Sequence, residues 1–181
     1  FNGNSGSGNY VVKRAGTSSV NSFNGFSSPV SDANLMSVFS GSNPCDIYAF
    51  DGASQTWKYD FTSGSSAMCK SNTVTFGPTD VIPSGNGVMD VGRGYFVPGS
   101  GVSTRQFSGE VNNGDLTMPI NVATNPGGVS WEGDDFNLVG NPYPSSIDAV
   151  KFWNENSVNN SRITNAIYFW DDGDAGSNYN Q

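Results

Sequence analysis

The chain has 181 residues, enough to bury a hydrophobic core as one domain or as two small lobes. Only 13% of its residues are charged, whereas about 25% are charged in an average soluble domain, and Gly, Ser and Asn take their place. The formal net charge is −8 and no basic run occurs, so electrostatic repulsion disfavours nucleic acid as a partner. Histidine is absent, which excludes His-based metal sites, the Ser-His-Asp triad and the Cys-His dyad, and with them most hydrolase chemistry.

The composition of both ends of the chain is typical of sequence inside a longer protein. No apolar segment reaches the roughly 20 residues that a transmembrane helix needs, and no basic-then-apolar signal peptide opens the chain. The first nine residues are a Gly-, Ser- and Asn-rich stretch typical of a linker. We therefore expect a piece of a larger protein, in which residues 1–22 form a linker and a first strand.

Short strands separated by turn residues dominate the pattern. Strand-like alternation starts at Tyr10–Lys13, and an extended run over residues 23–30 leads into a two-turn helix over residues 31–39, with Ser31 or Asp32 as its cap. A hairpin with an Asp-Gly turn follows over residues 46–59. Four further strands are predicted at Thr73–Phe76, Gly94–Val97, Thr104–Phe107 and Leu116–Val122.

A stiff corner at residues 136–148 organises the second half of the chain. An apolar run ends at Gly-Asn-Pro, turns through a second proline and restarts as a helix would, with Ser145 or Ser146 as the cap and Asp148 in the first turn. The residues that define this corner are Asn137, Gly140, Asn141, Pro142 and Pro144. Because proline fixes φ and restricts the preceding residue, the corner is rigid, and we interpret it as structural.

The corner occurs twice. At an offset of 113, the difference between 136 and 23, Phe23-Asn24 aligns with Phe136-Asn137 and Pro29 aligns with Pro142 without a gap. A short amphipathic helix and an Ile-Tyr-x-aromatic-Asp strand follow in both copies, at Ile47–Asp51 and Ile167–Asp171. We interpret this as an internal duplication that gives a first β lobe over residues 23–125 and a second, incomplete one over residues 126–181.

The two cysteines, Cys45 and Cys69, are either buried free thiols or a disulfide. Closing a loop of roughly 25 residues would stabilise the fold by about 3 kcal/mol in the chain-entropy model. Such a bond is most useful outside the cytosol, and a disulfide is the favoured interpretation.

Two groups of side chains are candidates for ligand binding. Asp171, Asp172 and Asp174 form an acidic loop that offers oxygen ligands to Ca²⁺, although it lacks the EF-hand spacing and an ordinary hairpin loop explains it as well. A carboxylate pair of a glycosidase can be imagined among Glu110, Asp134, Asp135 and Glu155, but no spacing supports one.

Aromatic side chains are the second group, because they can stack on sugars. The candidates are Trp57, Tyr59, Trp153, Trp170 and Tyr179. Core packing is the competing interpretation for the residues on strands and on the helix face. Trp57 and Tyr59 flank a hairpin, so we expect them to be the exposed ones and the candidate ligand-stacking pair.

The corner resembles a known sequence pattern. Residues 137–148, Asn-Leu-Val-Gly-Asn-Pro-Tyr-Pro-Ser-Ser-Ile-Asp, followed by Ile-Tyr-Phe-Trp-Asp at 167–171, resemble the "WNLVGNPYPSAIDW … IYVWD" repeat region of large secreted and surface proteins of Bacteroidetes. Upstream, "GRGYFV" and "FSGEVNNGDLT" resemble pieces that accompany it, so the likeness spans roughly residues 23–172. Phe23 and Phe136 stand where that pattern has Trp. The resemblance implies an adhesin-like cargo of the type IX secretion system.

Together these observations predict an all-β fold, an antiparallel β-sandwich or jelly-roll-like arrangement of two related lobes with short helices. The function we expect is a non-catalytic structural or adhesive module of a secreted, cell-surface bacterial protein, located outside the outer membrane. The alternative is a carbohydrate-binding module of a secreted multidomain enzyme. Expected partners are neighbouring modules or other surface proteins, polysaccharide and, by resemblance, the type IX machinery. No cofactor is expected apart from the candidate calcium ion.

Overall fold

The structure is a computed structural model of the whole chain. It describes residues 8–16, 18–19, 22–42, 46–58, 62–63, 66–67, 87–99, 101, 103–122, 135–163 and 166–169. The chain divides into two compact units, Phe1–Pro144 and Ser145–Gln181. The sequence places the start of a second lobe at residue 126, whereas the described residues 135–144 lie in the first unit.

In its described residues the first unit is rich in β-structure and contains one short helix. Its elements are β1 (Tyr10–Ala15), β2 (Phe23–Phe26), α1 (Leu35–Val38), β3 (Tyr48–Asp51), β4 (Thr56–Lys58), β5 (Thr62–Ser63), β6 (Ser66–Ala67), β7 (Tyr95–Pro98) and β8 (Thr104–Gly109). All pairings between these strands are antiparallel. The prediction of a β-rich antiparallel fold with few short helices is therefore confirmed.

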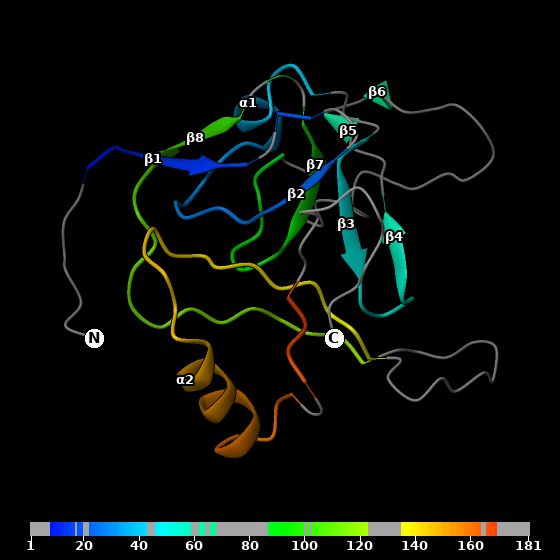
Figure 1. Cartoon of the computed structure of the whole chain (residues 1–181), viewed down its shortest axis with the longest axis vertical. Helices are drawn as coiled ribbons and strands as arrows, with labels where there is room; N and C mark the ends of the chain where they lie inside the picture. The colour runs from blue at the N-terminus through cyan, green and yellow to red at the C-terminus, as the bar shows by residue number, and fades with distance from the viewer. Residues whose placement is uncertain are drawn as a thin grey trace. The chain divides into compact units, whose positions relative to one another are not determined.

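Four strands form the main sheet, in the order β2-β7-β3-β4 (Figure 1). β7 is central because it pairs with β2 through Phe26↔Tyr95 and with β3 through Ala49↔Tyr95. β1 and β8 form a two-stranded sheet and lie side by side in Figure 1, and β5 pairs with β6. The Asp-Gly hairpin between β3 and β4 is present as predicted, with a turn over residues 52–55.

The hydrophobic core lies on one face of the main sheet. Ala49, Tyr95 and Val97 alternate with outward-facing neighbours and are fully buried, as period-2 alternation requires. Phe39, directly after α1, and Phe107 of β8 pack on this core with their ring centroids 6.2 Å apart and their planes 85° apart. α1 and β8 therefore cover the inner face of the sheet.

α1 begins one turn later than the sequence suggested. Its N-cap is Asn34, whose side-chain oxygen accepts hydrogen bonds from the backbone N–H of Met36 and of Ser37 at 3.1 and 3.2 Å. The predicted caps, Ser31 and Asp32, are wrong: Asp32 lies in the preceding turn with a φ of 55°. An Asx residue next to the helix satisfies the first free N–H groups directly.

The second unit contains α2 (Ala149–Trp153) and a π-helical turn, η2 (Asn154–Val158). Asp148 is the N-cap, since its carboxylate accepts from the backbone N–H of Lys151 at 3.0 Å. The predicted caps, Ser145 and Ser146, are therefore wrong, and Asp148 serves as the cap instead of lying in the first turn.

Two strand predictions differ from the structure. Residues 116–122 form no strand, and Pro119 lacks the N–H that a ladder requires. Residues 167–169 also form no strand. The predicted strand at Thr73–Phe76 lies outside the described residues.

Candidate functional site

The outer face of the main sheet carries a cluster of aromatic side chains, which we call the aromatic face. Strand register places Tyr48 opposite Phe96 and Phe50 opposite Trp57, and side chains opposite one another share a face. The five rings come from all four strands: Phe23 on β2, Phe96 on β7, Tyr48 and Phe50 on β3, and Trp57 on β4.

These rings contact one another in two groups, one of Phe23 with Tyr48 and one of Phe50, Trp57 and Phe96. Phe23 meets Tyr48 edge to face with the centroids 5.5 Å apart, and Phe50 meets Trp57 at 5.2 Å and 71°. Trp57 also stacks on Phe96, with the centroids 5.0 Å apart and the planes only 25° apart. Edge-to-face and offset-stacked pairs of this kind stabilise beyond their buried area by about 0.5–1.5 kcal/mol each.

Trp57 is the most exposed ring of the aromatic face. Its relative exposure is 40%, whereas that of Phe96 beneath it is 7%. One face of the indole thus packs on Phe96, while part of the ring is exposed to solvent. The prediction that Trp57 is exposed is confirmed. Its partner in that prediction, Tyr59, lies outside the described residues.

The hairpin turn beside Trp57 is polar and internally fixed. The Asp51 carboxylate accepts hydrogen bonds from the Ala53 N–H at 3.0 Å and from the Ser54 hydroxyl at 2.6 Å. Gln55, with a left-handed φ of 50°, exchanges two hydrogen bonds of 3.0 Å with the backbone N–H and C=O of Phe136. The turn therefore places carboxylate and hydroxyl oxygens next to the aromatic face, while the Gln55 amide is engaged with Phe136.

The corner residues are used to attach residues 136–144 to the rest of the first unit. Asn137 mimics a strand partner, since its side chain accepts from the Asn121 N–H and donates to the Asn121 C=O, both at 2.9 Å. The Gly140 N–H donates to the Gly92 C=O at 2.8 Å, and the Gly94 N–H donates to the Leu138 C=O at 3.2 Å.

The proline turn itself is fixed by side-chain hydrogen bonds. The Asn141 side chain accepts from the Tyr143 N–H at 2.9 Å, which forms an Asx turn around Pro142. The Tyr143 hydroxyl donates to the Gly114 C=O at 2.7 Å, and the Arg14 guanidinium donates to the Tyr143 C=O. Pro144 is exposed and is the last residue of the first unit.

The two copies of the corner meet in space. Asn112 donates its backbone N–H to the C=O of Pro29 at 3.0 Å and its side-chain amide to the C=O of Pro142 at 2.9 Å. Pro29 and Pro142 are equivalent positions at the offset of 113. Ser27 and Gly140 are also equivalent, and a Cβ on Gly140 would lie 2.3 Å from the Ser27 Cβ. Glycine at 140 is therefore required by this close approach.

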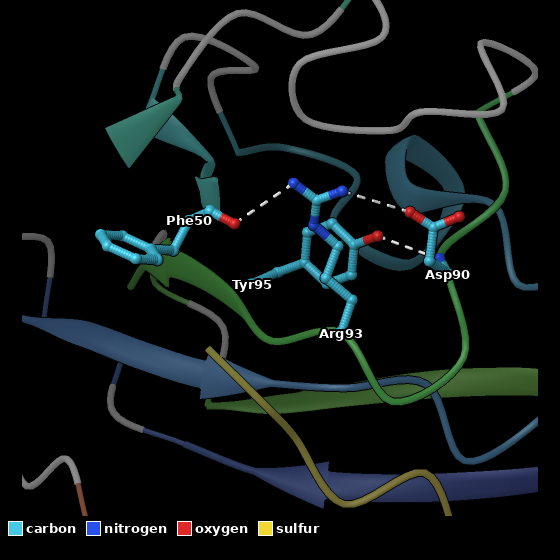
Figure 2. Close-up of polar contacts among 4 residues, drawn as sticks. All are labelled: Phe50, Asp90, Arg93 and Tyr95. Carbon is cyan, nitrogen blue, oxygen red and sulfur yellow. Dashed lines mark hydrogen bonds and ion pairs between the residues drawn. The ribbon is translucent and has the colours of Figure 1, made fainter. Parts of the chain in front are cut away.

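An ion pair lies where β7 begins, as Figure 2 shows. Arg93 forms a 3.4 Å ion pair with Asp90 and donates to the Phe50 C=O at 3.4 Å, while the Asp90 N–H donates to the Tyr95 hydroxyl at 3.0 Å. Burial raises the pKa of Asp90, and Arg93 partly opposes this. Burial, helped by the nearby Asp90 charge, raises the pKa of Tyr95 well above its ordinary value. A turn at residues 91–92 precedes this strand, with a left-handed φ of 76° at Gly92.

β8 also buries a cation. Arg105 is 4% exposed, donates to the Ser42 hydroxyl at 3.1 Å, and lies 5.5 Å from the centre of the Phe39 ring. Burial lowers its pKa, and the cation–π contact and hydrogen bonds compensate for lost hydration. Arg105 therefore has a structural role in the core.

The second unit contains an open apolar groove of about 300 Å³, lined by Ala149, Val150, Trp153, Ala166, Ile167 and Phe169. Trp153, one of the candidate stacking residues, is half-buried in this wall. Val150 and Phe169 are largely exposed. The groove contains aliphatic and aromatic side chains and little polar surface.

Several candidate residues lie outside the described residues. They are the disulfide pair Cys45 and Cys69, the acidic loop Asp171, Asp172 and Asp174, and Asp134, Trp170 and Tyr179. The disulfide and the calcium site stay predictions. Among the carboxylates that are described, Glu110, Asp135 and Glu155 are not buried. The described residues contain no group of three or more metal-ligating side chains. Within the same residues, no helix has both the length and the apolar character needed to span a bilayer.

Sequence reasoning missed most of the aromatic face and the role of Asn112. The rings come from segments up to seventy or so residues apart along the chain, and only the strand register brings them together. Asn112 was part of an Asn-Asn-Gly-Asp turn signal, and its contact with both prolines has no local sequence signature. The spacing of the two corners was the one signal that pointed toward their meeting.

The fold and these sites define a β-rich module in which the most distinctive polar residues bind the backbone. The whole chain, residues 1–181, matches the family described as a domain of unknown function (DUF8693), and the chain belongs to that family. Neither a curated protein nor a solved structure matches it.

Proposed function

We propose that the chain is a non-catalytic structural and adhesive module of a secreted, cell-surface protein of the Bacteroidetes type. Its architecture in this proposal is sandwich-like, with two related lobes. The observation that supports it best is the joining of the two proline corners through Asn112. The polar side chains of this region hold distant segments of the chain together.

The hydrogen bonds of the corner favour a mechanical role. Residues 136–144 are attached at several separate points: to the hairpin through Gln55, to Gly92, to Asn121 and to Asn112. Each hydrogen bond contributes only about 0.5–1.5 kcal/mol, but several such bonds along one segment together hold it more firmly than any one of them. A surface protein that transmits tension between modules needs this arrangement.

The setting outside the cell, the type IX export route and contacts with neighbouring modules follow from the resemblance of residues 23–172. The low charge and the many Ser, Asn and Gly residues are consistent with a surface that packs against other modules. The second candidate is a carbohydrate-binding module of a secreted multidomain enzyme. The exposed Trp57 on the aromatic face is the observation that favours it.

A surface experiment tests the proposal. An antibody against residues 1–181 should label intact cells of the source bacterium, and external protease should remove the label. Beads coated with the chain should attach to the same cells more than beads coated with an unrelated acidic β-protein. Labelling of permeabilised cells alone, or equal attachment of both kinds of bead, would refute the surface-adhesive function. A catalytic domain in the full-length protein would favour the second candidate.

A further inference from the structure

We propose that the aromatic face binds a neutral polysaccharide, with a sugar ring stacked on Trp57. This inference rests on the proposed adhesive function and names the class of ligand that the surface recognises. It extends the candidate pair Trp57 and Tyr59 to a face built from all four strands of the main sheet.

The geometry of Trp57 is that of a prepared stacking platform. Phe96 lies nearly parallel beneath the indole at 5.0 Å, and Phe50 closes one edge at 71°. The ring therefore loses little conformational freedom when a ligand binds, which lowers the entropic cost of association. Its 40% exposure leaves area for contact. The C–H-bearing face of a pyranose ring is flat and apolar, and it matches such a platform.

The arrangement of the other rings favours a chain of sugars over a single one. Phe23, Phe96, Phe50 and Trp57 belong to β2, β7, β3 and β4, which are neighbours in the sheet in that order. Adjacent strands lie about 4.8 Å apart, a step comparable to the length of one sugar residue in a polymer. Phe23, Tyr48 and Phe50 are half-buried and can contact a ligand beside the exposed Trp57, whereas Phe96 is covered by the indole and only supports it.

The negative charge of the chain favours a neutral polysaccharide over an acidic one. The chain carries a formal net charge of −8, and Asp51 lies in the turn that adjoins the aromatic face, so a uronate or sulfated polymer would be repelled. The same turn presents the Asp51 carboxylate and the exposed Ser54 hydroxyl, whose oxygens can accept hydrogen bonds from sugar hydroxyls. A purely apolar partner would leave these polar groups facing an apolar surface, which is unfavourable.

Affinity electrophoresis and calorimetry on the full chain test the inference. The probes are hydroxyethylcellulose, arabinoxylan, laminarin and soluble starch as neutral polymers, and alginate and pectate as acidic ones. At least one neutral polymer should retard the wild-type chain, and neither acidic polymer should. Trp57→Ala should weaken that binding about tenfold or more, by analogy with the loss of an aromatic stacking partner, and Trp57→Phe should have an intermediate effect.

Tyr168→Ala is the matched control, because Tyr168 is 55% exposed and lies in the second unit. It should bind as the wild type does. Circular dichroism should show that the variants are folded, and if Trp57→Ala is not, Trp57→Phe with its intact ring packing decides the outcome. The inference would be overturned if both Trp57 variants were retarded as strongly as the wild type, if only the acidic polymers retarded the chain, or if no polymer did. It would also be overturned if sedimentation showed a dimer that depends on Trp57 while no glycan is bound. If coated beads still attach to cells in those cases, the adhesive function stands and only the ligand class is wrong.

Discussion

The two copies of the proline corner use similar sequences in different surroundings. In the first copy, β2 forms a four-residue ladder with β7, and the helix that follows is packed into the core by Leu35 and Phe39. In the second copy, residues 136–140 form a single bridge, Val139↔Arg93, and the helix that follows has no fully buried residue. A repeated sequence therefore does not guarantee a repeated environment.

The comparison shows which interactions stabilise each copy. The first copy is stabilised mainly by burial of apolar area, at roughly 25 cal/mol for each Å² removed from water. The second is held by side-chain amides, those of Asn137, Gln55 and Asn112, that bind backbone groups. The helices still align closely, since Phe39 and Trp153 each follow their caps, Asn34 and Asp148, by five residues.

Truncating these two equivalent aromatics should give the largest contrast. Phe39 is fully buried and meets Phe26 at 5.3 Å and Phe107 at 6.2 Å, so Phe39→Ala should lower the free energy of unfolding by about 3–5 kcal/mol. Trp153 is half-buried, and Trp153→Ala should cost below about 2 kcal/mol. Urea unfolding followed by circular dichroism measures both. Equal losses would show that the two helices are packed alike.

A methyl group at the meeting point of the corners should have the next largest effect. In Gly140→Ala the new Cβ would approach the Ser27 Cβ to 2.3 Å, so one corner must move, at a cost of about 1–3 kcal/mol. Gly8→Ala is the control, because its Cβ would make only an ordinary contact with Tyr10 at 3.5 Å. If thermal unfolding shows no difference between the two variants, the corners do not touch in solution.

The parts of the fold that were predictable are those with a local signal. The hairpin was marked by Asp51-Gly52 between alternating residues, and α1 by Leu35 and Val38 on one face. The strand predicted at 116–122 was wrong because alternation alone ignores what the side chains contact: Met118 packs against Gly92, where a Cβ would lie 3.1 Å away. Tertiary contact determines this segment without a ladder.

The candidate site was predictable only at its edge. Trp57 could be recognised because it flanks a hairpin, whereas the other rings of the aromatic face depend on the register of four strands. The helix caps were misplaced by two or three residues for a related reason. Several Ser and Asx residues precede each helix, and the sequence does not say which one has the extended backbone that Asn34 and Asp148 adopt.

Removing the amide that joins the two prolines should have a moderate effect. Asn112→Ala deletes the side-chain hydrogen bonds to the Pro142 C=O at 2.9 Å and the Ser28 C=O at 3.1 Å but keeps the backbone bond to Pro29. The expected loss is about 1–2 kcal/mol in unfolding experiments. Asn113→Ala is the control at the neighbouring position, since Asn113 is exposed and its side chain accepts a hydrogen bond from the adjacent Gly114 N–H at 2.8 Å. Amide hydrogen exchange should become faster at residues 138–140 in the first variant. Unchanged protection there would mean that the second corner is held by other contacts.

The smallest expected effect on stability comes from the ion pair between Asp90 and Arg93, just before β7. The pKa of Asp90 is raised from 3.8 by burial, so the folded state favours its protonated form. Its contribution to stability is full below pH 3.8 and is lost as the pH rises through the raised pKa, because the unfolded carboxyl ionises first. In Asp90→Asn this loss is absent. The wild type should therefore lose melting temperature relative to Asp90→Asn between pH 3.8 and neutrality, with Asp135→Asn, at an exposed carboxylate, as the control.

Tyr95 gives a second pH range in which the stability of the fold should fall as the pH rises. Its pKa is raised from 10.0, so the stability it contributes is present below pH 10 and is lost above it as the unfolded phenol ionises. Tyr95→Phe should melt at a lower temperature than the wild type at neutral pH, because the Asp90 N–H loses its acceptor, and the difference should shrink above pH 10. Parallel melting curves across both windows would mean that this segment is more hydrated than its burial indicates.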